Sequence, residues 1–208
     1  MMAYFMRYYE RLGTALLEHL VLLGITMAVS IALAALITAA LSRSRAAENA
    51  TLRIFGALYA IPSLALFSML IPFLGIGLKT AVFVLVLYNQ FLLIRNFSAG
   101  LRGVDAALIE AAAGLGMTEL QTLLTVKIPL ALPVITGGIR IAVISTIGIG
   151  TIAAVINAGG LGTVLFDGLR TMNPVKLIWG MILAAALSLF ANGTLSLLEK
   201  YLRKKFNS

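Results

Sequence analysis

The chain contains no cysteine, which excludes disulfides, thiolate metal sites and cysteine nucleophiles. Charged residues make up only 12% of the 208 residues, about half of the usual share in a soluble domain. The single histidine, His19, has no clustered metal-ligating neighbours, so we expect it at the solvent or the membrane interface and expect no metal site. No acid, base and nucleophile come together along the sequence, and an intramembrane enzyme is therefore disfavoured.

Hydrophobic residues account for 61% of the chain, more than a soluble fold of this length buries. The formal net charge is +8, but the basic residues lie at the ends of apolar runs. That placement is typical of a membrane protein, and we expect no nucleic-acid partner. A helix crosses the bilayer core with about 20 apolar residues. Five runs reach or approach this length: 20–41, 54–78, 80–94, 141–166 and 177–198.

The fold expected from these runs is all-α, a polytopic membrane protein with about five transmembrane helices in one domain over residues 1–208. Residues 1–19 precede the first run and combine aromatic residues (Tyr8, Tyr9) with charged ones (Arg11, Glu18). This mixture predicts an interfacial helix in contact with the lipid bilayer rather than a cleavable signal peptide.

Lysine and arginine are distributed unequally between the two sides of these runs. Ten of them follow the first, third and fifth runs, five lie on the opposite side, and Arg140 lies at the edge of the fourth run. Cytoplasmic segments carry an excess of Lys and Arg. The distribution therefore predicts an N-terminus outside the cell, with the C-terminus and the segment between the third and fourth runs in the cytoplasm.

Residues 98–133, in that cytoplasmic segment, change from apolar to helix-forming and turn-forming residues. Asp105 is a suitable N-cap for a helix that ends near Gly116, where glycine allows a left-handed turn. Thr118 and Gln121 have the spacing of a capping box for a second helix. Two prolines are expected to end that second helix: Pro129 and Pro133. The segment therefore predicts a rigid projection toward a soluble partner.

One motif in this segment consists of Glu110-Ala111-Ala112, then Gly116, then Val126-Lys127-Ile128-Pro129. Its spacing resembles the EAA loop of ABC importer permeases, EAA-x3-G-x9-I-x-L-P. Val126 replaces the Ile of that motif, and Ile128 replaces the Leu. The resemblance implies a type I ABC importer permease fold, in which this loop is a coupling helix docked on an ABC ATPase subunit. ATP would be bound by that partner, so no cofactor is expected here. The residues assigned to the ATPase contact are Leu108, Ile109, Glu110, Ala111, Ala112, Gly116, Met117 and Pro129.

Three further segments (residues 61–77, 92–104 and 159–169) resemble the permeases for osmoprotectants such as glycine betaine, choline and carnitine. The resemblance implies a bacterial cytoplasmic (inner) membrane protein that pairs with a second permease copy or a paralogue. It also implies ABC ATPase subunits and an extracytoplasmic solute-binding protein as partners. Methionine-type and other amino-acid importer permeases share several of these features and stay open as the alternative.

A quaternary ammonium cargo has no N–H group to donate and is usually held by aromatic faces. Proline inside an apolar run frees backbone carbonyls that can line a path. These two arguments, with the polar residues of the apolar runs, select the pathway candidates Tyr59, Pro62, Ser63, Tyr88, Asn89 and Asn192.

A self-sufficient secondary transporter is the alternative of another class. Such proteins have internal repeats and intramembrane charges for ion coupling. We find no internal repeat, and the five expected runs contain no Asp, Glu or Lys. The sequence therefore favours an ATP-driven importer permease.

Overall fold

The computed structural model describes residues 2–206, with side chains from residue 6 onward, and every regular element in that part of the chain is helical. The α-helices are α1 (Met2–Leu41), α2 (Arg45–Ala60), α3 (Ser63–Leu74), α4 (Leu78–Arg102), α5 (Ala106–Gly114), α6 (Glu119–Thr122), α7 (Ile128–Ile152), α8 (Gly162–Arg170) and α9 (Pro174–Phe206). A π-helical turn, Leu123–Lys127, joins α6 to α7, and a 3₁₀ turn, Ala153–Ile156, follows α7.

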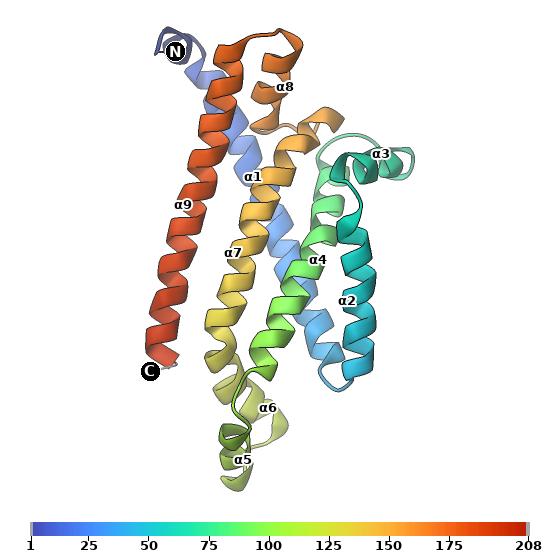
Figure 1. Ribbon diagram of the computed structural model, residues 1–208, viewed down its shortest axis with the longest axis vertical. Coiled ribbons are helices and arrows are strands. Elements are labelled where there is room, and N and C mark those ends of the chain that lie inside the picture. Colours follow the sequence, from blue (N-terminus) through green and yellow to red (C-terminus); the bar gives the residue numbers. More distant parts are fainter. Residues whose placement is uncertain (1, 207–208) are drawn as a thin grey trace.

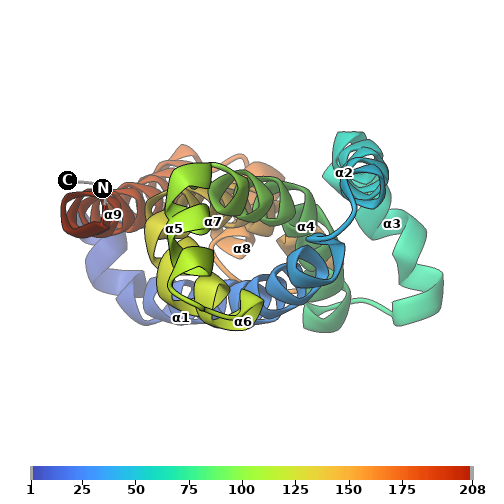
Figure 2. The ribbon, with the colours of Figure 1, turned by 90° about the horizontal axis from the view of Figure 1, so that it is seen from below.

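The long helices α1, α4, α7 and α9 form a bundle that runs the length of the molecule (Figure 1). Helices α5 and α6 project from one end, whereas the N-terminus, α3 and α8 lie toward the other. Helix α2 packs against α4 at the margin of the bundle, and α3 turns away from it (Figures 1 and 2). The all-α fold expected from the sequence is confirmed.

Within the described residues, four helices are long and apolar enough to cross a membrane: Met6–Leu41 of α1, α4, the continuous stretch Glu119–Ile156, and α9. Helices α2 and α3 meet the same test only as a pair, and they are bent by 97° at their junction. Counting that bent pair as one span makes five, in agreement with the five apolar runs of the sequence.

The fourth span differs from the expected run of residues 141–166. Helix α7 begins at Ile128 and ends at Ile152, and the chain then turns through Asn157 (φ 62°) and Gly160 (φ 81°) into the separate helix α8. Left-handed backbone at these positions stops the helix, although every residue there is uncharged. Arg140 lies inside α7 and not at its edge.

Pro129 and Pro133 do not end a helix, contrary to the expectation from the sequence. Pro129 lies in the first turn of α7, where a missing N–H is tolerated, and Pro133 lies inside α7. The π-helical turn Leu123–Lys127 immediately precedes them and accommodates the irregular hydrogen bonding. The segment between α4 and α7, which the sequence predicts to be cytoplasmic, is therefore residues 103–127, shorter than the predicted 98–133.

The predicted interfacial segment 1–19 does not end at residue 19 in the structure. Helix α1 runs from Met2 to Leu41 and is broken at Tyr8 (φ −127°), where two helical pieces meet at a kink, and residue 1 lies outside the described residues. The contact of this segment with the membrane interface stays a prediction. His19 is only 1% exposed, so the expectation of a solvent or interface position was wrong.

Acidic residues also lie inside the membrane-spanning helices, which the apolar runs did not indicate. Glu18 of α1 accepts a hydrogen bond from the backbone N–H of Gly160 at 2.8 Å. Helix α9 continues past residue 198 and includes Glu199, which pairs with Arg140 of α7. The Glu18 carboxylate therefore joins α1 to the turn before α8, and the Glu199 carboxylate joins α9 to α7.

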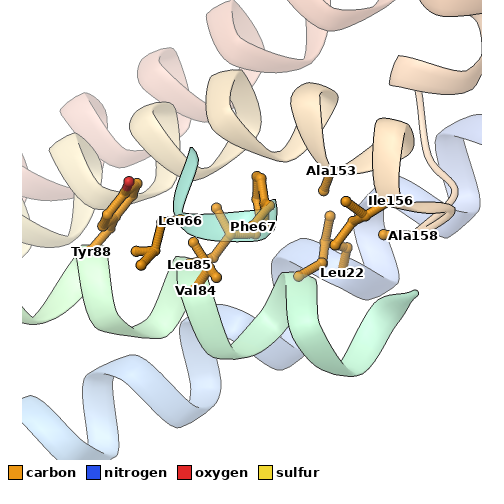
Figure 3. Close-up of a cluster of buried hydrophobic side chains, with 10 residues drawn as sticks. Leu22, Leu66, Phe67, Val84, Leu85, Tyr88, Ala153, Ile156 and Ala158 are labelled. Atoms are coloured by element: carbon orange, nitrogen blue, oxygen red, sulfur yellow. The ribbon is translucent and has the colours of Figure 1, made fainter. Parts of the chain in front are cut away.

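One buried apolar cluster lies where α3 meets the bundle (Figure 3). Leu66 and Phe67 of α3 pack on Val84 and Leu85 of α4, and all four are at most 2% exposed. The other members are Leu22 of α1, Ala81 and Tyr88 of α4, and three residues after α7: Ala153, Ile156 and Ala158. Burial of Leu66 and Phe67 holds the first half of α3 against the bundle despite the sharp bend.

Candidate functional site

The residues of the EAA-like loop form the short helix α5 at the projecting end of the molecule (Figure 1). The Asp105 carboxylate accepts a hydrogen bond from the backbone N–H of Ala107 at 2.9 Å and caps the helix. The following residues have high helix propensity, so the helix forms locally. The N-cap predicted from the sequence is confirmed.

A tight turn at Gly116 reverses the chain after α5. Gly116 has φ +78°, and the backbone N–H of Met117 donates to the carbonyl oxygen of Ala112 at 3.1 Å. This left-handed cap favours glycine. Thr118 and Gln121 then form the predicted capping box: Gln121 Oε1 accepts from the N–H of Thr118 at 2.8 Å, and Thr118 Oγ1 accepts from the N–H of Gln121 at 3.3 Å.

An apolar groove of about 440 Å³ lies between α5 and the start of α7. Its lining residues are Leu108, Ala111, Ala112, Leu115, Met117, Thr125, Val126, Pro129, Leu130 and Phe206. Most residues assigned to the ATPase contact therefore lie together. Glu110 projects into solvent, Ile109 is partly exposed and Gly116 forms the turn.

Two members of this surface, Leu115 and Phe206, were missed from the sequence. Leu115 is 82% exposed although it is a large apolar residue, and the predicted Leu108 is 46% exposed. Exposed apolar residues gathered at one end of a molecule mark a surface for a protein partner. Leu115 could have been found from its position beside the glycine turn. Phe206 comes from the other end of the chain, so no local signal indicates it.

The α2–α3 junction is the second region that sequence reasoning selected. Ile61 and Pro62 have extended backbone angles, because a residue before proline avoids the α-helical region. The hydroxyl of Tyr88 in α4 donates to the freed carbonyl oxygen of Ile61 at 2.6 Å. Pro62, Ser63 and Tyr88, predicted separately, therefore lie at one place in the fold.

Aromatic rings gather beside this junction. The ring centroids of Tyr59 and Tyr88 are 5.5 Å apart in an edge-to-face arrangement, and the ring centroid of Phe91 is also 5.5 Å from that of Tyr59. The Tyr59 hydroxyl lies 3.5 Å from Ser145 Oγ of α7. Such a cluster offers ring faces and hydroxyl oxygens to a cation, once neighbouring side chains move apart.

The two asparagines selected as pathway candidates make contacts between helices. Asn89 is 2% exposed and donates to Thr146 Oγ1 (2.9 Å) and Ser30 Oγ (3.3 Å), which joins α1, α4 and α7. Asn89 directly follows Tyr88 in α4, but its side chain bonds to α1 and α7 rather than to the aromatic rings. Asn192 of α9 accepts a hydrogen bond from Arg140 at 3.2 Å, so both side chains hold helices together in this structure.

The opposite end of the molecule has a cluster of charged side chains around α8. Asp167 forms ion pairs at 2.9 Å with Lys176 of α9 and with Arg11 of α1. The hydrogen bond from Lys176, with the positive charge of Arg11, lowers the pKa of the Asp167 carboxyl below its ordinary value. Among the described residues, no group of three or more His, Cys, Asp or Glu is placed to hold a metal ion.

Known proteins resemble the chain over almost its whole length. It is 37% identical to the carnitine transport permease protein OpuCB of Listeria monocytogenes over 185 residues, which are 89% of this chain and 82% of the relative. It is 36% identical to the osmoprotectant import permease protein OsmW of Salmonella typhimurium, over 93% of each chain. The glycine betaine/carnitine/choline transport system permease protein OpuCB of Bacillus subtilis is 34% identical over 90% of this chain and 87% of the relative.

Solved structures share the fold. A chain of the MetNI methionine ABC transporter, from a study of its inward facing conformations, superposes with a TM-score of 0.83 over 92% of this chain and 95% of that one, at 20% identity. An amino acid ABC transporter gives a TM-score of 0.74 over 98% and 97% of the two chains, also at 20% identity. Residues 15–208 match the family of binding-protein-dependent transport system inner membrane components. With its α5 projection, its bent α2–α3 pair and this match, the chain belongs to that family of ABC transporter permeases.

Proposed function

We propose that this chain is the permease subunit of an ATP-driven importer for osmoprotectants such as glycine betaine, choline or carnitine. The observation that supports coupling of transport to ATP hydrolysis is the exposed apolar surface of α5, together with the groove between α5 and α7. The cargo class is supported by relatives that are named for carnitine, choline, glycine betaine or osmoprotectants.

In this proposal, α5 docks on an ABC ATPase subunit, which binds and hydrolyses the ATP. Leu108 and Leu115 supply apolar contact area, and the small residues Ala111 and Ala112 allow close approach. Glu110 is exposed and offers a carboxylate to a basic side chain of the ATPase. Other proposed partners are a second permease copy or paralogue and an extracytoplasmic solute-binding protein.

The end with α5 and α6 is placed in the cytoplasm, and the N-terminus and α8 outside. Lys127 lies beside α5, and the last turn of α9 contributes Arg203, Lys204 and Lys205. Cytoplasmic segments attract such residues. The orientation is therefore N-terminus out and C-terminus in.

The α2–α3 junction is proposed as part of the pathway wall. Tyr59 and Tyr88 present aromatic rings there, and Ile61 presents a backbone carbonyl next to Pro62 and Ser63. Aromatic faces stabilise quaternary ammonium groups through cation–π interactions of about 0.5–2 kcal/mol each. A wall of this kind suits a cargo that has a positive charge and no N–H donor.

The test is reconstitution of the chain in proteoliposomes with its ATPase and solute-binding protein, with glycine betaine uptake measured in the presence of ATP. Glu110→Lys reverses the charge of the docking helix, and Gly116→Pro removes its left-handed cap. We expect both variants to reach the membrane and to lose ATP-driven uptake. Lys204→Glu makes a charge change of the same size and opposite sign at an exposed site of α9 and serves as the control, with uptake retained.

Different results overturn different parts of this proposal. An ATPase complex that is stimulated by methionine and not by betaines keeps the permease role and rejects the cargo class. If no ATPase co-purifies with the chain, or if Glu110→Lys and Gly116→Pro transport at the wild-type rate, the assignment of α5 as the docking helix is wrong.

A further inference from the structure

A salt bridge joins α2 to α4 at the end of the bundle that carries α5. Arg102, in the last turn of α4, donates to the carboxylate of Glu48 in the first turn of α2. Glu48 is 7% exposed, and the Arg102 side chain is 35% exposed. Each charge is also at the favourable end of its own helix dipole, negative near an N-terminus and positive near a C-terminus.

This pair lies next to the proposed docking helix along the chain. Only Gly103 and Val104 separate Arg102 from Asp105, the N-cap of α5. The N–H of Gly103 still bonds to the carbonyl oxygen of Ala99 at 2.9 Å, so the end of α4 is ordered up to this link. A displacement of α5 therefore reaches Arg102 through a very short connection.

On the other side of the salt bridge is an arm formed by α2 and α3. The arm lies at the margin of the bundle, and α2 packs against α4 and α1 (Figures 1 and 2). The bend between α2 and α3 is tied to α4 by the hydrogen bond from Tyr88 to Ile61. Polar contacts thus hold α2 to α4 at both of its ends, at Glu48 near the docking helix and at Ile61 at the bend.

The burial of Glu48 separates this pair from an ordinary surface contact. Arg43 and Glu119 form a second ion pair nearby, but their side chains are 88% and 89% exposed, and pairs of that kind contribute little. Removal of Arg102 would leave the Glu48 carboxylate buried without its partner, which is strongly unfavourable. Breaking the salt bridge between Glu48 and Arg102 is therefore costly, and the contact keeps α2 and α4 in fixed positions relative to each other.

We propose that the Glu48–Arg102 pair is the joint that passes movement of α5 to the α2–α3 arm, and that both residues are positioning residues for transport. The inference rests on the proposed function, because it needs α5 to be moved by an ATPase. Because α2 is one uninterrupted helix of 16 residues, a shift at Glu48 moves the bend beside Tyr59 and Tyr88 as well. The pair thereby links ATP-driven movement to the proposed pathway wall.

The experiment uses the whole reconstituted complex and measures ATP hydrolysis and uptake together. We expect Glu48→Gln to retain solute-stimulated hydrolysis while the amount of solute moved per ATP falls by about fivefold or more. The charge-reversed double variant Glu48→Arg with Arg102→Glu should regain much of that ratio. Arg53→Gln, at an exposed site on the same helix, should keep the wild-type ratio.

A cross-link gives a second measurement that does not depend on a charge substitution. The chain has no cysteine, so Glu48→Cys with Arg102→Cys places the only two thiols of this chain at the joint. We expect transport per ATP to be low in the untreated double variant and restored by a short bifunctional maleimide. Equal ratios before and after cross-linking, or a normal ratio in Glu48→Gln, would overturn the joint while leaving the importer function intact. Loss of ATP-driven uptake in the unsubstituted complex would instead refute the proposed function, and the joint with it.

Discussion

Arg140 and Glu199 form an ion pair between two membrane-spanning helices. Arg140 lies inside α7, its guanidinium is 3.1 Å from the Glu199 carboxylate of α9, and it also donates to Asn192 at 3.2 Å. The side chains are 30% and 19% exposed. A charge at such a site needs a partner, because apolar surroundings do not solvate it.

Glu199→Gln is expected to destabilise the protein by about 1–3 kcal/mol, because Arg140 would lose its charged partner and keep only neutral acceptors. The measurement is the thermal unfolding midpoint of the purified chain in detergent. Lys200→Gln, at the neighbouring exposed position, should leave the midpoint unchanged. Equal midpoints for both variants would show that the Arg140 contact contributes nothing to stability.

At the other end of the molecule, the ion pairs of Asp167 are expected to make the stability of the protein depend on pH. Its pKa is lowered in the folded protein by the hydrogen bond from Lys176 and the charge of Arg11, from an ordinary value of 3.8. A lowered folded-state pKa means that the stabilisation is present above the unfolded-state pKa and is lost as pH falls through the folded-state pKa. The ion pairs therefore stabilise the protein at neutral pH and fail only in acid.

Comparison of the wild type with Asp167→Asn isolates this contribution. We expect the variant to have the lower unfolding midpoint, by a constant difference from neutral pH down to about pH 5. Below about pH 4 the difference should shrink, because the wild-type carboxylate becomes protonated. A difference that stays constant into strong acid would mean that the two cations do not stabilise the charged form of Asp167.

At the scale of elements, α4 and α7 approach each other closely at a glycine. A Cβ atom built on Gly138 of α7 would lie 2.4 Å from the Cβ atom of Asn96 in α4. Only a residue without a side chain fits there, and small residues at a crossing allow membrane helices to pack closely. Gly148, on the same helix, has nothing within 4 Å of such an atom.

Gly138→Ala is therefore expected to destabilise the bundle by about 1–3 kcal/mol through overpacking. Gly148→Ala is the matched control, and its expected effect is neutral or stabilising by up to about 1 kcal/mol, since alanine has the higher helix propensity. Unfolding midpoints in detergent check both. If the two substitutions have the same effect, α4 and α7 do not cross at Gly138.

Local chemistry explains which elements were predicted well. Asp105, Thr118 and Gln121 act on backbone groups within three residues, so their caps were visible in the sequence and are confirmed. Proline at residue 62 likewise marked the α2–α3 break. Pro129 misled the prediction, because a π-helical turn immediately before it lets the chain stay helical.

At the scale of the whole molecule, the two ends carry different surfaces. Leu115, beside α5, is 82% exposed at one end, and Met172, after α8, is 86% exposed at the other. The proposed orientation puts Leu115 in the cytoplasm and Met172 outside. The absence of cysteine makes this orientation directly measurable with single-cysteine variants.

In intact cells without the ATPase partner, a membrane-impermeant maleimide should label Met172→Cys and not Leu115→Cys. A permeant maleimide should label both, and the cysteine-free parent chain should remain unlabelled by either reagent. The reverse pattern would place the N-terminus in the cytoplasm and would also remove α5 from the reach of a cytoplasmic ATPase.

The sequence by itself determined the membrane setting, the helical fold, the approximate number of spans and the form of the EAA-like loop. Each depends on composition, on the length of apolar runs or on groups within a helical turn of one another. The predicted ends of the spans were less accurate, because they were set at charged residues. The fourth span ends before an uncharged turn at Asn157, and the charged residue Arg140 lies inside α7.

Only the tertiary structure decided which distant residues meet. Arg102 and Glu48 are 54 positions apart, and Phe206 reaches the groove beside Leu108 from near the C-terminus of the chain. Such contacts depend on how whole helices cross, and helix crossing depends on many side chains at once. A buried charge is stable only beside a partner of opposite charge. The reason for its position is therefore seen only in the packed bundle, where the two residues meet.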